Sequence, residues 1–436
     1  MNEPVSKSLS KFIAGTGLRC IVKAPPGSGK SYNLLESLDG AIKAGKRIAI
    51  TAQTNNQVDD LCARFCERYP KEIIYRFSSQ FYQASDDLPK RATVVADKND
   101  LPLEGSVMIG TVSKLGLIEF TTPYDILLVD EAWQMTWAAL LTIRDVSKRT
   151  ILIGDPGQIP PTVTIEVDRW EVSPDAPHRA APDIILENPD LVKDTTILNL
   201  EVCRRLPHDS VGLVRTFYDF EFSPLAKKGE RFVKATKKSD GSPMDRAVDL
   251  LIRSSTVILA HPTSEEGAPI ETDRELANLA ARIATRLLER GCLISTNPDE
   301  QSAPRKLVAA DIGIVSTHNQ MNTAIQKELT SKFAEIRVTT PERWQGLERA
   351  IMIAVHPLSG VMFPSSFDLE TGRLCVMASR HQSACIFVTR DHVGETLDTH
   401  MPVADQALGR SDVVGRGHHQ HTDFWRYHAA RELIVS

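Results

Sequence analysis

The sequence predicts a doubly wound α/β fold with mostly parallel sheets, repeated in two domains of a 436-residue chain. Short continuous apolar runs alternate with amphipathic segments, as buried parallel strands alternate with the helices that cover them. A glycine-rich stretch, 24–31, separates the first apolar run from the first helical segment. The alternation stops in a proline-rich stretch at 160–189 and then restarts, which indicates a second domain.

The first half contains five predicted strands and two predicted helices. One helix carries Leu34, Leu35, Leu38 and Ile42 at helical spacing and is expected to end near Gly45. The next carries an apolar stripe of five residues in which the cysteines fit core packing better than metal binding: Val58, Leu61, Cys62, Phe65 and Cys66. The predicted strands are 20–22, 47–51, 106–111, 125–132 and 150–155.

The second half repeats the pattern without a glycine-rich phosphate loop. Its predicted helix is Glu275–Arg290, and its predicted strands are 256–262, 310–317, 336–340, 350–356 and 383–389. We therefore expect a first domain at 1–200, a second at 201–400 and a C-terminal tail at 401–436. The tail is rich in Gly, His and Arg, and we expect it to be mobile until an amphipathic segment at Asp423–Ile434.

Composition narrows the classes of function. The seven cysteines form no CxxC pair, which argues against a disulfide framework or a zinc ribbon. No apolar run is long enough to span a bilayer and no signal segment is apparent, so we expect a cytoplasmic protein without a membrane partner. Because the net charge is −5, a nucleic acid would have to meet a locally basic surface.

The stretch APPGSGKS, 24–31, has the form of a phosphate-binding loop. Backbone N–H groups of a glycine-rich turn and a helix N-terminus make a concave anion site. Lys30 is expected to reach the β- and γ-phosphates of a nucleotide, and the Ser31 hydroxyl to ligate Mg²⁺. A plain turn is the alternative, but the order of strand, loop and helix disfavours it. Ala24 is expected to have a negative φ.

Two further strand ends carry polar residues that suit triphosphate chemistry. In LLVDEA, Asp130 is the candidate metal residue and Glu131 the candidate base for water. In GDPGQIPP, Gln158 is the candidate sensor of the γ-phosphate. In the second half, Arg204 and Arg380 are candidates for stabilising the transferred phosphoryl group. Each arginine alone would more often be a solvated or structural side chain.

Eight motifs, taken in order, resemble those of superfamily 1 helicases, and are most similar to the branch that includes the RNA helicase of nonsense-mediated decay. They span about 24–390 and read APPGSGKS, TAQTNNQVDDL, GTV, VDEAWQ, GDPGQIPP, EVCRRLP, ERWQGLER and VMASR. The resemblance implies two RecA-like P-loop domains, with ATP and Mg²⁺ in a cleft between them. It also implies single-stranded DNA or RNA bound across both domains.

The resemblance assigns a role to each matching residue. It implies phosphate and cofactor contacts, with magnesium at Ser31 and Asp130, for Pro26, Gly27, Ser28, Gly29, Lys30 and Ser31. It implies catalytic roles for Lys30, Glu131, Gln158, Arg204 and Arg380, and a ribose contact for Glu348. It implies nucleic-acid contacts for Thr54, Asn55, Thr111 and Gln345, with Ser316–Asn319 as weaker candidates.

The chain also departs from the family pattern. Ala24 replaces a glycine, Gln53 a proline, and Cys203 and Leu206 a tyrosine and a histidine. The glutamine motif that reads adenine has no clear counterpart before Lys23, and the insertions of unwinding members look short or absent.

A basic run at 227–238 fits either nucleic-acid contact or a solvated loop. Trp133, Trp137 and Trp344 fit core packing better than base stacking, and the tail histidines fit a solvated segment better than a metal site.

Three functions fit these residues. The leading interpretation is an ATP-driven helicase or translocase that moves along single-stranded nucleic acid, 5′→3′ by the resemblance. The second is an ATP-gated clamp that hydrolyses ATP without unwinding. The third is one subunit of a larger repair or defence assembly with other protein partners. A monomer is compatible with all three.

Overall fold

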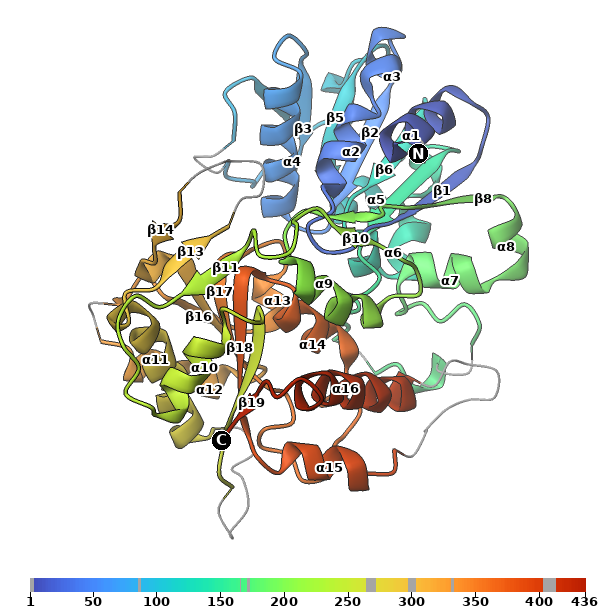
Figure 1. The fold of residues 1–436 in the computed structure, drawn as a ribbon. Coiled ribbons are helices and arrows are strands. Elements are labelled where there is room, and N and C mark those ends of the chain that lie inside the picture. Colours follow the sequence, from blue (N-terminus) through green and yellow to red (C-terminus); the bar gives the residue numbers. More distant parts are fainter. Residues whose placement is uncertain are drawn as a thin grey trace. The chain divides into compact units, whose positions relative to one another are not determined.

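The computed structural model describes residues 4–84, 88–164, 166–170, 173–263, 272–296, 303–330, 333–402 and 413–436. The chain divides into two compact units, shown in Figure 1. Unit 1 comprises Met1–Pro156 and Pro160–Leu200, and unit 2 comprises Gly157–Ile159 and Glu201–Ser436. No helix in the described part of the chain is long and apolar enough to cross a membrane.

Unit 1 is built on an eight-stranded sheet in the order β4-β3-β5-β2-β6-β7-β1-β8, with every neighbouring pair parallel. The α/β fold with parallel strands is therefore confirmed. The five predicted strands are present, whereas β3, β4 and β8 at the two sides of the sheet were not predicted. The bounds are β1 Arg19–Lys23, β2 Ile48–Ala52, β3 Ile74–Phe77, β4 Ala92–Val95, β5 Val107–Thr111, β6 Ile126–Val129, β7 Thr150–Gly154 and β8 Thr195–Asn199.

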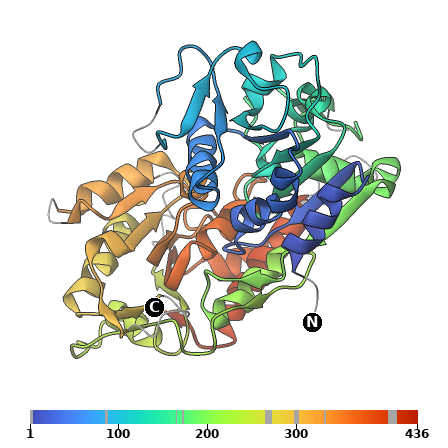
Figure 2. The same cartoon turned by 90° about the horizontal axis from the view of Figure 1, so that it is seen from above.

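Helices cover both faces of this sheet because alternate strand residues point to opposite sides. On one face, α1, α2, α3 and α4 pack over residues such as Val22 and Ile50. On the other, α5, α6 and α7 pack over their neighbours Ile21 and Ala49. The views of Figures 1 and 2 show this layering. The bounds are α1 Val5–Ala14, α2 Lys30–Glu36, α3 Asp39–Lys43, α4 Asn55–Arg68, α5 Val112–Gly116, α6 Trp137–Thr142, α7 Ala181–Glu187 and α8 Pro189–Lys193.

Unit 2 contains a six-stranded parallel sheet in the order β16-β15-β17-β18-β12-β19. Helices α10, α11 and α12 cover one face, and α9, α14 and α16 the other. The strands are β12 Thr256–His261, β15 Ile312–Val315, β16 Arg337–Thr339, β17 Arg349–Val355, β18 His381–Arg390 and β19 Ile434–Val435. The helices are α9 His208–Val214, α10 Pro243–Leu250, α11 Arg274–Glu289, α12 Asn319–Glu328, α13 Pro341–Trp344, α14 Thr371–Ala378, α15 Val393–Thr399 and α16 Val413–Ala429.

Unit 2 also carries two small sheets that were not predicted. One pairs β9 (Val202–Cys203) with β10 (Ser223–Pro224). The other has three antiparallel strands, β11 (Phe232–Lys234), β13 (Leu293–Ser295) and β14 (Arg305–Lys306). Runs of two or three residues are too short to show a periodicity in the sequence.

One helix prediction in unit 1 needs correction. The single helix expected to end near Gly45 is two helices, α2 and α3, separated at Ser37 and Leu38. The Ser37 hydroxyl donates to the Leu34 carbonyl at 2.6 Å, a local bond that competes with the helical ladder. The proline-rich stretch at 160–189, where the alternation stops, contains the helix α7, with Pro182 in its first turn, where proline is tolerated.

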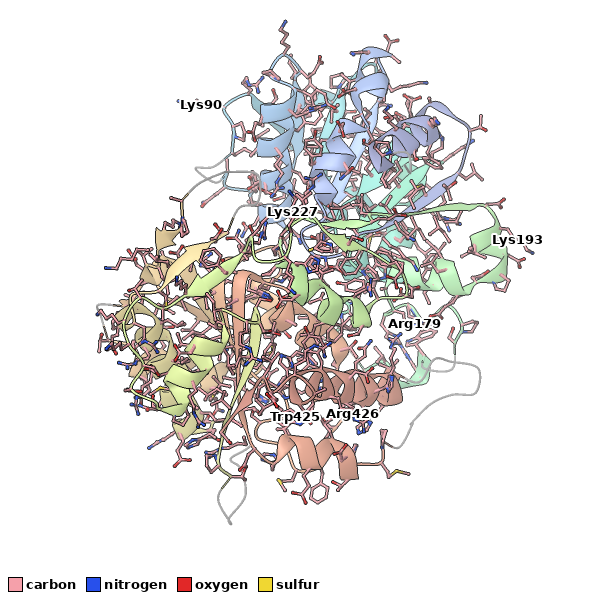
Figure 3. The ribbon with its side chains drawn as sticks, viewed as in Figure 1. Lys90, Arg179, Lys193, Lys227, Trp425 and Arg426 are labelled. Carbon is pink, nitrogen blue, oxygen red and sulfur yellow. The ribbon has the colours of Figure 1, made fainter. Side chains whose placement is uncertain are left out.

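The prediction of a mobile tail is also corrected. Residues 403–412 lie outside the described residues, but α16 begins at Val413, ten residues before the expected segment. Phe424 of α16 is buried in the core of unit 2, and β19 pairs with β12. Trp425, labelled in Figure 3, packs closely over Gly394 of α15. His421 is fully buried, contrary to the expected solvated histidines.

Candidate nucleotide-binding site and nucleic-acid interface

The phosphate loop joins β1 to α2 in unit 1. Gly27 and Gly29 have φ values of 64° and 77°, a region that glycine enters without the steric cost of a Cβ. Among the described residues, positive φ outside glycine occurs only at Glu131 and Glu432, so the predicted negative φ of Ala24 is confirmed. The Ala24 side chain is fully buried in the core, and its N–H donates to the Gly154 carbonyl of β7 at 2.9 Å.

Lys30 opens α2 and reaches the end of β6. Its ammonium nitrogen lies 2.8 Å from each carboxylate oxygen of Glu131. Both side chains are only 16% exposed, so the pair is shielded from solvent screening. The neighbouring hydroxyl of Ser31 donates to Asp130 Oδ2 at 3.5 Å. Four residues predicted from two sequence motifs therefore lie in one cluster.

The two carboxylates differ in their environments. Burial and the adjacent Glu131 charge raise the pKa of Asp130 to about 6. The positive charge of Lys30 opposes this rise but does not cancel it. Asp130 Oδ1 also accepts the Glu131 N–H at 2.9 Å. Glu131 has a φ of 51°, a left-handed conformation that costs a non-glycine residue about 1 kcal/mol. The strained turn after β6 directs the Glu131 carboxylate towards Lys30.

The loop has the features that a nucleotide and Mg²⁺ require. The Ser28 hydroxyl is buried and has no hydrogen-bond partner among the described residues, so it can donate to a phosphate oxygen. Asp130 and Ser31 offer two hard oxygen ligands, and Mg²⁺ is commonly held by one or two such groups plus phosphates and water. The described residues contain no cluster of three or more His, Cys, Asp or Glu side chains suited to a metal.

The strand order explains how the motifs converge. All strands of the unit 1 sheet are parallel, so the segments after β1, β6 and β7 leave the same edge. Strand β7 lies between β1 and β6, which places Asp155 between the phosphate loop and the carboxylates. The next residues, Gly157–Ile159, including Gln158, belong to unit 2. A Cβ at Gly372 of α14 would lie 2.6 Å from the Gln158 carbonyl oxygen, so this glycine permits the close packing.

The predicted nucleic-acid residues of unit 1 cap two neighbouring helices. Thr54 caps α4, and its hydroxyl accepts the Gln57 N–H at 3.3 Å. Thr111 caps α5, and its hydroxyl accepts the Lys114 N–H at 3.2 Å. Strands β2 and β5 are adjacent, with Ala52 opposite Thr111, so both helix N-termini lie at the carboxyl edge of the sheet. Positive helix ends with N–H donors suit a phosphate backbone.

Asn55 is exposed, and its side-chain oxygen accepts a hydrogen bond from Arg76 Nη2 at 2.9 Å. Arg76 is fully buried on β3 and pairs with Asp59 at 2.7 Å. The Gln57 amide donates to Gln134 at 3.0 Å, which connects α4 to the turn that follows Glu131. Gln57 and Gln134 lie within two of the quoted motifs but were given no role there, and Arg76 lies outside all eight motifs.

In unit 2, Glu348 and Arg380 precede the adjacent strands β17 and β18. The Arg349 N–H donates to the Arg380 carbonyl at 3.0 Å, so their backbones are neighbours. Glu348 accepts from Arg205 Nε at 2.5 Å and from Gln382 Nε2 at 2.7 Å. Burial opposes ionisation, but the charge and hydrogen bond of Arg205 outweigh it, and the pKa of Glu348 is lowered.

The two predicted arginines of unit 2 differ in exposure. Arg380 is 1% exposed, whereas Arg204 is exposed. Arg205, which sequence reasoning passed over, holds Glu348 and also donates to the Ser379 carbonyl at 3.3 Å. In the pair Arg204–Arg205, a sequence alone does not show which guanidinium faces a carboxylate. Gln345 is half-buried and follows α13, where Gly346 has a φ of 76°.

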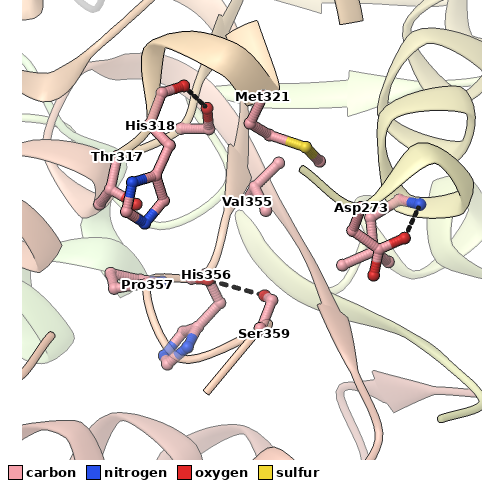
Figure 4. A pocket seen from close by; sticks show the side chains of 11 residues that line it. Asp273, Thr317, His318, Met321, Val355, His356, Pro357 and Ser359 are labelled. Atoms are coloured by element: carbon pink, nitrogen blue, oxygen red, sulfur yellow. Dashed lines mark hydrogen bonds between the residues drawn. The ribbon is translucent and has the colours of Figure 1, made fainter. Parts of the chain in front are cut away.

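Of the weaker candidates Ser316–Asn319, the first three line a small cavity in unit 2, shown in Figure 4. The cavity has a volume of about 30 Å³ and lies at the carboxyl ends of β15 and β17. Ser316 is held by Asn322 at 3.0 Å, and His318 packs beside Phe367 with ring centroids 5.9 Å apart. A space of this size is too small for a nucleobase. Trp133 and Trp344 are both buried, as predicted for core packing.

Comparisons with known proteins agree with the broad family that the motifs predict. A family model described as an AAA domain matches residues 97–166, which include Asp130, Glu131 and Gln158. DNA polymerase alpha-associated DNA helicase A of Saccharomyces cerevisiae is 20% identical over 443 residues, covering 84% of this chain and 62% of the relative. The DNA replication ATP-dependent helicase/nuclease DNA2 of the same yeast is 26% identical over 157 residues, covering 34% and 10%.

Solved structures with some likeness include the arterivirus nonstructural protein 10 helicase, alone and in complex with DNA. Each has a TM-score of 0.43 and 14% identity, and the two cover 90% and 89% of this chain and 64% and 63% of theirs. The chain spans less than two thirds of the relatives that it matches. The family and sequence matches, with the ordered motifs, support placing the chain among the superfamily 1 helicases. The narrower resemblance to one branch stays a prediction.

Proposed function

We propose that the chain is an ATP hydrolase of the helicase type that acts on single-stranded nucleic acid. The observation that carries this proposal is the cluster at the carboxyl edge of the unit 1 sheet. There, Lys30 contacts Glu131 at 2.8 Å, and Ser31 lies 3.5 Å from Asp130. The relatives' names, which describe a DNA helicase and an ATP-dependent helicase/nuclease, support the same reaction class.

Each residue of the cluster has a distinct task in this proposal. The backbone of Gly27–Gly29 and the Ser28 hydroxyl hold phosphate oxygens, and Lys30 exchanges its carboxylate partner for the terminal phosphates. Ser31 and Asp130 would hold Mg²⁺, which would neutralise charge on the phosphates. Once Lys30 turns to phosphate, Glu131 is free to orient a water molecule and accept its proton.

The proposal also gives roles to residues of unit 2 and to the candidate nucleic-acid contacts. Gln158 senses the terminal phosphate, Arg204 and Arg380 stabilise charge on the transferred group, and Glu348, held by Arg205, contacts the ribose. Thr54, Asn55, Thr111 and Gln345 contact single-stranded DNA or RNA. We propose that hydrolysis drives movement along the strand, with 5′→3′ polarity taken from the family resemblance.

A second function, an ATP-gated clamp that does not unwind, is favoured by the small size of the accessory elements. In the described part of unit 2, the sheets outside the main sheet consist of strands of two or three residues. Nucleotide-dependent binding without strand displacement would identify the clamp. Partner proteins of a larger assembly would be compatible with either function.

The decisive experiment measures ATP hydrolysis with and without single-stranded DNA and RNA. We expect stimulation by at least one polymer, and a loss of hydrolysis of about 10²-fold or more in Lys30→Ala and Glu131→Gln. Lys148→Ala is a matched control, because Lys148 is exposed just before the amino end of β7. Activity that survives Lys30→Ala would show that the site has been misplaced.

A strand-displacement assay on tailed duplexes separates the two functions. A helicase separates the strands in an ATP-dependent way and the clamp does not. Substrates with 5′ and 3′ tails test the proposed polarity, since movement 5′→3′ requires the 5′ tail.

A further inference from the structure

The small antiparallel sheet of unit 2 has one buried face and one basic face. The register places Val233 opposite Ile294, and Lys234 opposite Leu293, which in turn faces Lys306. Successive side chains alternate between the two faces of a sheet. Val233 and Ile294 therefore point inward, whereas Lys234, Leu293 and Lys306 point outward. Val233 and Ile294 are buried in the core, whereas Lys234 and Lys306 are exposed. These two lysines are separated by one strand, a distance of about 10 Å.

More lysines flank the first strand of this sheet. All are exposed, and Lys227, labelled in Figure 3, has a side chain that is 87% exposed. Together with Lys234 and Lys306 they form a set that we name the lysine sheet: Lys227, Lys228, Lys234, Lys237, Lys238 and Lys306. The whole chain has a net charge of −5, so a concentration of lysines on one small element is distinctive.

The nearby carboxylates are already engaged by other groups. Glu230 accepts the backbone N–H of Lys227 at 2.7 Å, and its closest approach to the Lys227 ammonium is 4.0 Å. Asp311 pairs with Arg305 at 2.6 Å and also accepts the Val308 N–H.

Three more carboxylates, those of Asp240, Asp245 and Asp249, pair with Arg286 or Arg290 of the segment that ends α11. Within the described residues, the other five ammonium groups of the lysine sheet have no carboxylate within 4.0 Å. Asp299 and Glu300 lie outside the described residues.

The backbone that carries these lysines is held in place. The N–H groups of Thr236 and Lys237 donate to the Arg290 carbonyl, at 3.2 and 3.1 Å, and Arg290 Nε donates to the Lys237 carbonyl at 3.1 Å. Arg290 is 3% exposed and pairs with Asp249 at 2.7 Å. A backbone that is already held loses less conformational entropy when a ligand binds than the backbone of a loose loop.

We infer that the lysine sheet is a second nucleic-acid-binding surface, which contacts the phosphodiester backbone without reading bases. This inference rests on the proposed function, and it adds a surface distinct from the helix N-termini of α4 and α5. Ammonium groups spread over one small exposed sheet suit a regularly charged polyanion. Lysine acts as a point charge and needs no fixed geometry at each phosphate.

The test compares the affinity of the full chain for fluorescent oligo-dT and oligo-U at several salt concentrations. The variant is Lys234→Glu with Lys306→Glu, and Lys234→Gln with Lys306→Gln is the milder version. We expect at least tenfold weaker binding at low salt for the glutamate pair. For the glutamine pair we expect a shallower slope of log affinity against log salt, by about 0.7 for each lysine. A pair of arginines at the same positions should retain binding.

The matched control is Lys43→Glu with Lys148→Glu, which changes the net charge equally at exposed positions of unit 1. It should leave affinity and salt slope unchanged, and thermal unfolding of each variant verifies the fold. If the wild type binds and the lysine-sheet variants behave like the control, this inference alone is overturned. If the wild type binds neither polymer at low salt, the proposed function fails with it. Competition by polyglutamate as strong as by oligonucleotide would assign the surface to an acidic protein and overturn the inference.

Discussion

Single residues determine how the cluster in unit 1 responds to pH. Lys30, Asp130 and Glu131 lie close together. The Lys30 ammonium, which we propose binds phosphate, contacts the Glu131 carboxylate in this structure. Asp130 is 7% exposed, whereas the side chain of Glu131 is 16% exposed. In the function proposed above, the two adjacent acids have different roles: Asp130 holds the metal ion and Glu131 accepts a proton from water.

The raised pKa of Asp130 predicts that the affinity for Mg²⁺ depends on pH. Only the carboxylate form ligates Mg²⁺, and the pKa is about 6, so metal affinity should fall by about tenfold per pH unit below pH 6. Above pH 7 affinity should be constant, since the carboxylate is then ionised. Titration of Mg²⁺ in the presence of a non-hydrolysable nucleotide between pH 5 and 8 measures this, and the same titration of Asp130→Asn separates the contribution of Asp130 from protonation of the nucleotide phosphates, whose last pKa is about 6. A flat profile down to pH 5 would contradict the proposed role of Asp130.

At the scale of elements, α14 connects the Gln158 loop with Arg380. The backbone of Gln158 and Ile159 lies directly against Gly372, in the first turn of the helix, while Arg380 follows two residues after its end. The loop and the arginine are therefore positioned by one short helix. This arrangement depends on the absence of a side chain at one position.

Gly372→Ala tests this packing. The added Cβ would lie 2.6 Å from a backbone oxygen, so the loop or the helix must shift, and we expect a loss of about 1–3 kcal/mol of unfolding free energy. Gly212→Ala is the matched control, because a Cβ added at this position of α9 would have no other atom within 4 Å. The control should be stabilised by about 0.5–1 kcal/mol. Urea unfolding measures both, and equal stability of the two variants would contradict the close approach.

Helix α16 introduces an acid-sensitive element into unit 2. His421 and His356 are buried with ring centroids 5.3 Å apart, and neither nitrogen of His421 has a hydrogen-bond partner among the described residues. Burial lowers the pKa of His421 to about 3 and of His428 to about 4. Both rings are therefore neutral in the folded protein near pH 7.

Because the pKa values of His421 and His428 are lowered in the folded protein, acid should destabilise it. An unfolded histidine binds a proton near pH 6.5, while the buried rings do so only at lower pH, so protons favour the unfolded state. The unfolding free energy should be constant above pH 7. It should fall by up to about 1.4 kcal/mol per pH unit for each histidine between pH 6.5 and 4.

His421→Leu should reduce this slope and stabilise the protein at pH 7, because it removes a buried polar ring whose nitrogens have no hydrogen-bond partner among the described residues. Denaturant unfolding at several pH values checks both effects, with the exposed His419→Leu as control. An unchanged slope in His421→Leu would contradict the lowered pKa of His421.

For the whole molecule, ligand binding and stability are linked. A nucleotide that binds only the folded chain should raise the free energy of unfolding by about 2.7 kcal/mol at a concentration of one hundred times Kd. We expect a rise in the midpoint of thermal unfolding with Mg²⁺ and a non-hydrolysable ATP analogue, a smaller rise with EDTA, and none in Lys30→Ala. A full rise in that variant would show that the nucleotide binds elsewhere.

Sequence patterns predicted the central strands of both large sheets and the residues of the cluster in unit 1. These patterns are local: apolar runs identify buried strands, and the glycines of 27–29 identify a turn that needs positive φ. The methyl group of Ala24 raised no conflict, because it is buried against the sheet with negative φ. The sequence also determined which side chains are chemically able to act.

Only the tertiary structure decided which of these side chains meet. The pairing of Lys30 with Glu131 joins residues 101 positions apart, and the choice of Arg205 over Arg204 for Glu348 depends on which face of a short segment points inward. The small sheet that carries the lysines pairs the strands 232–234, 293–295 and 305–306, and α16 buries His421, which the composition suggested was solvated. In each case the deciding term is the burial or pairing of residues distant in sequence, which no local pattern contains.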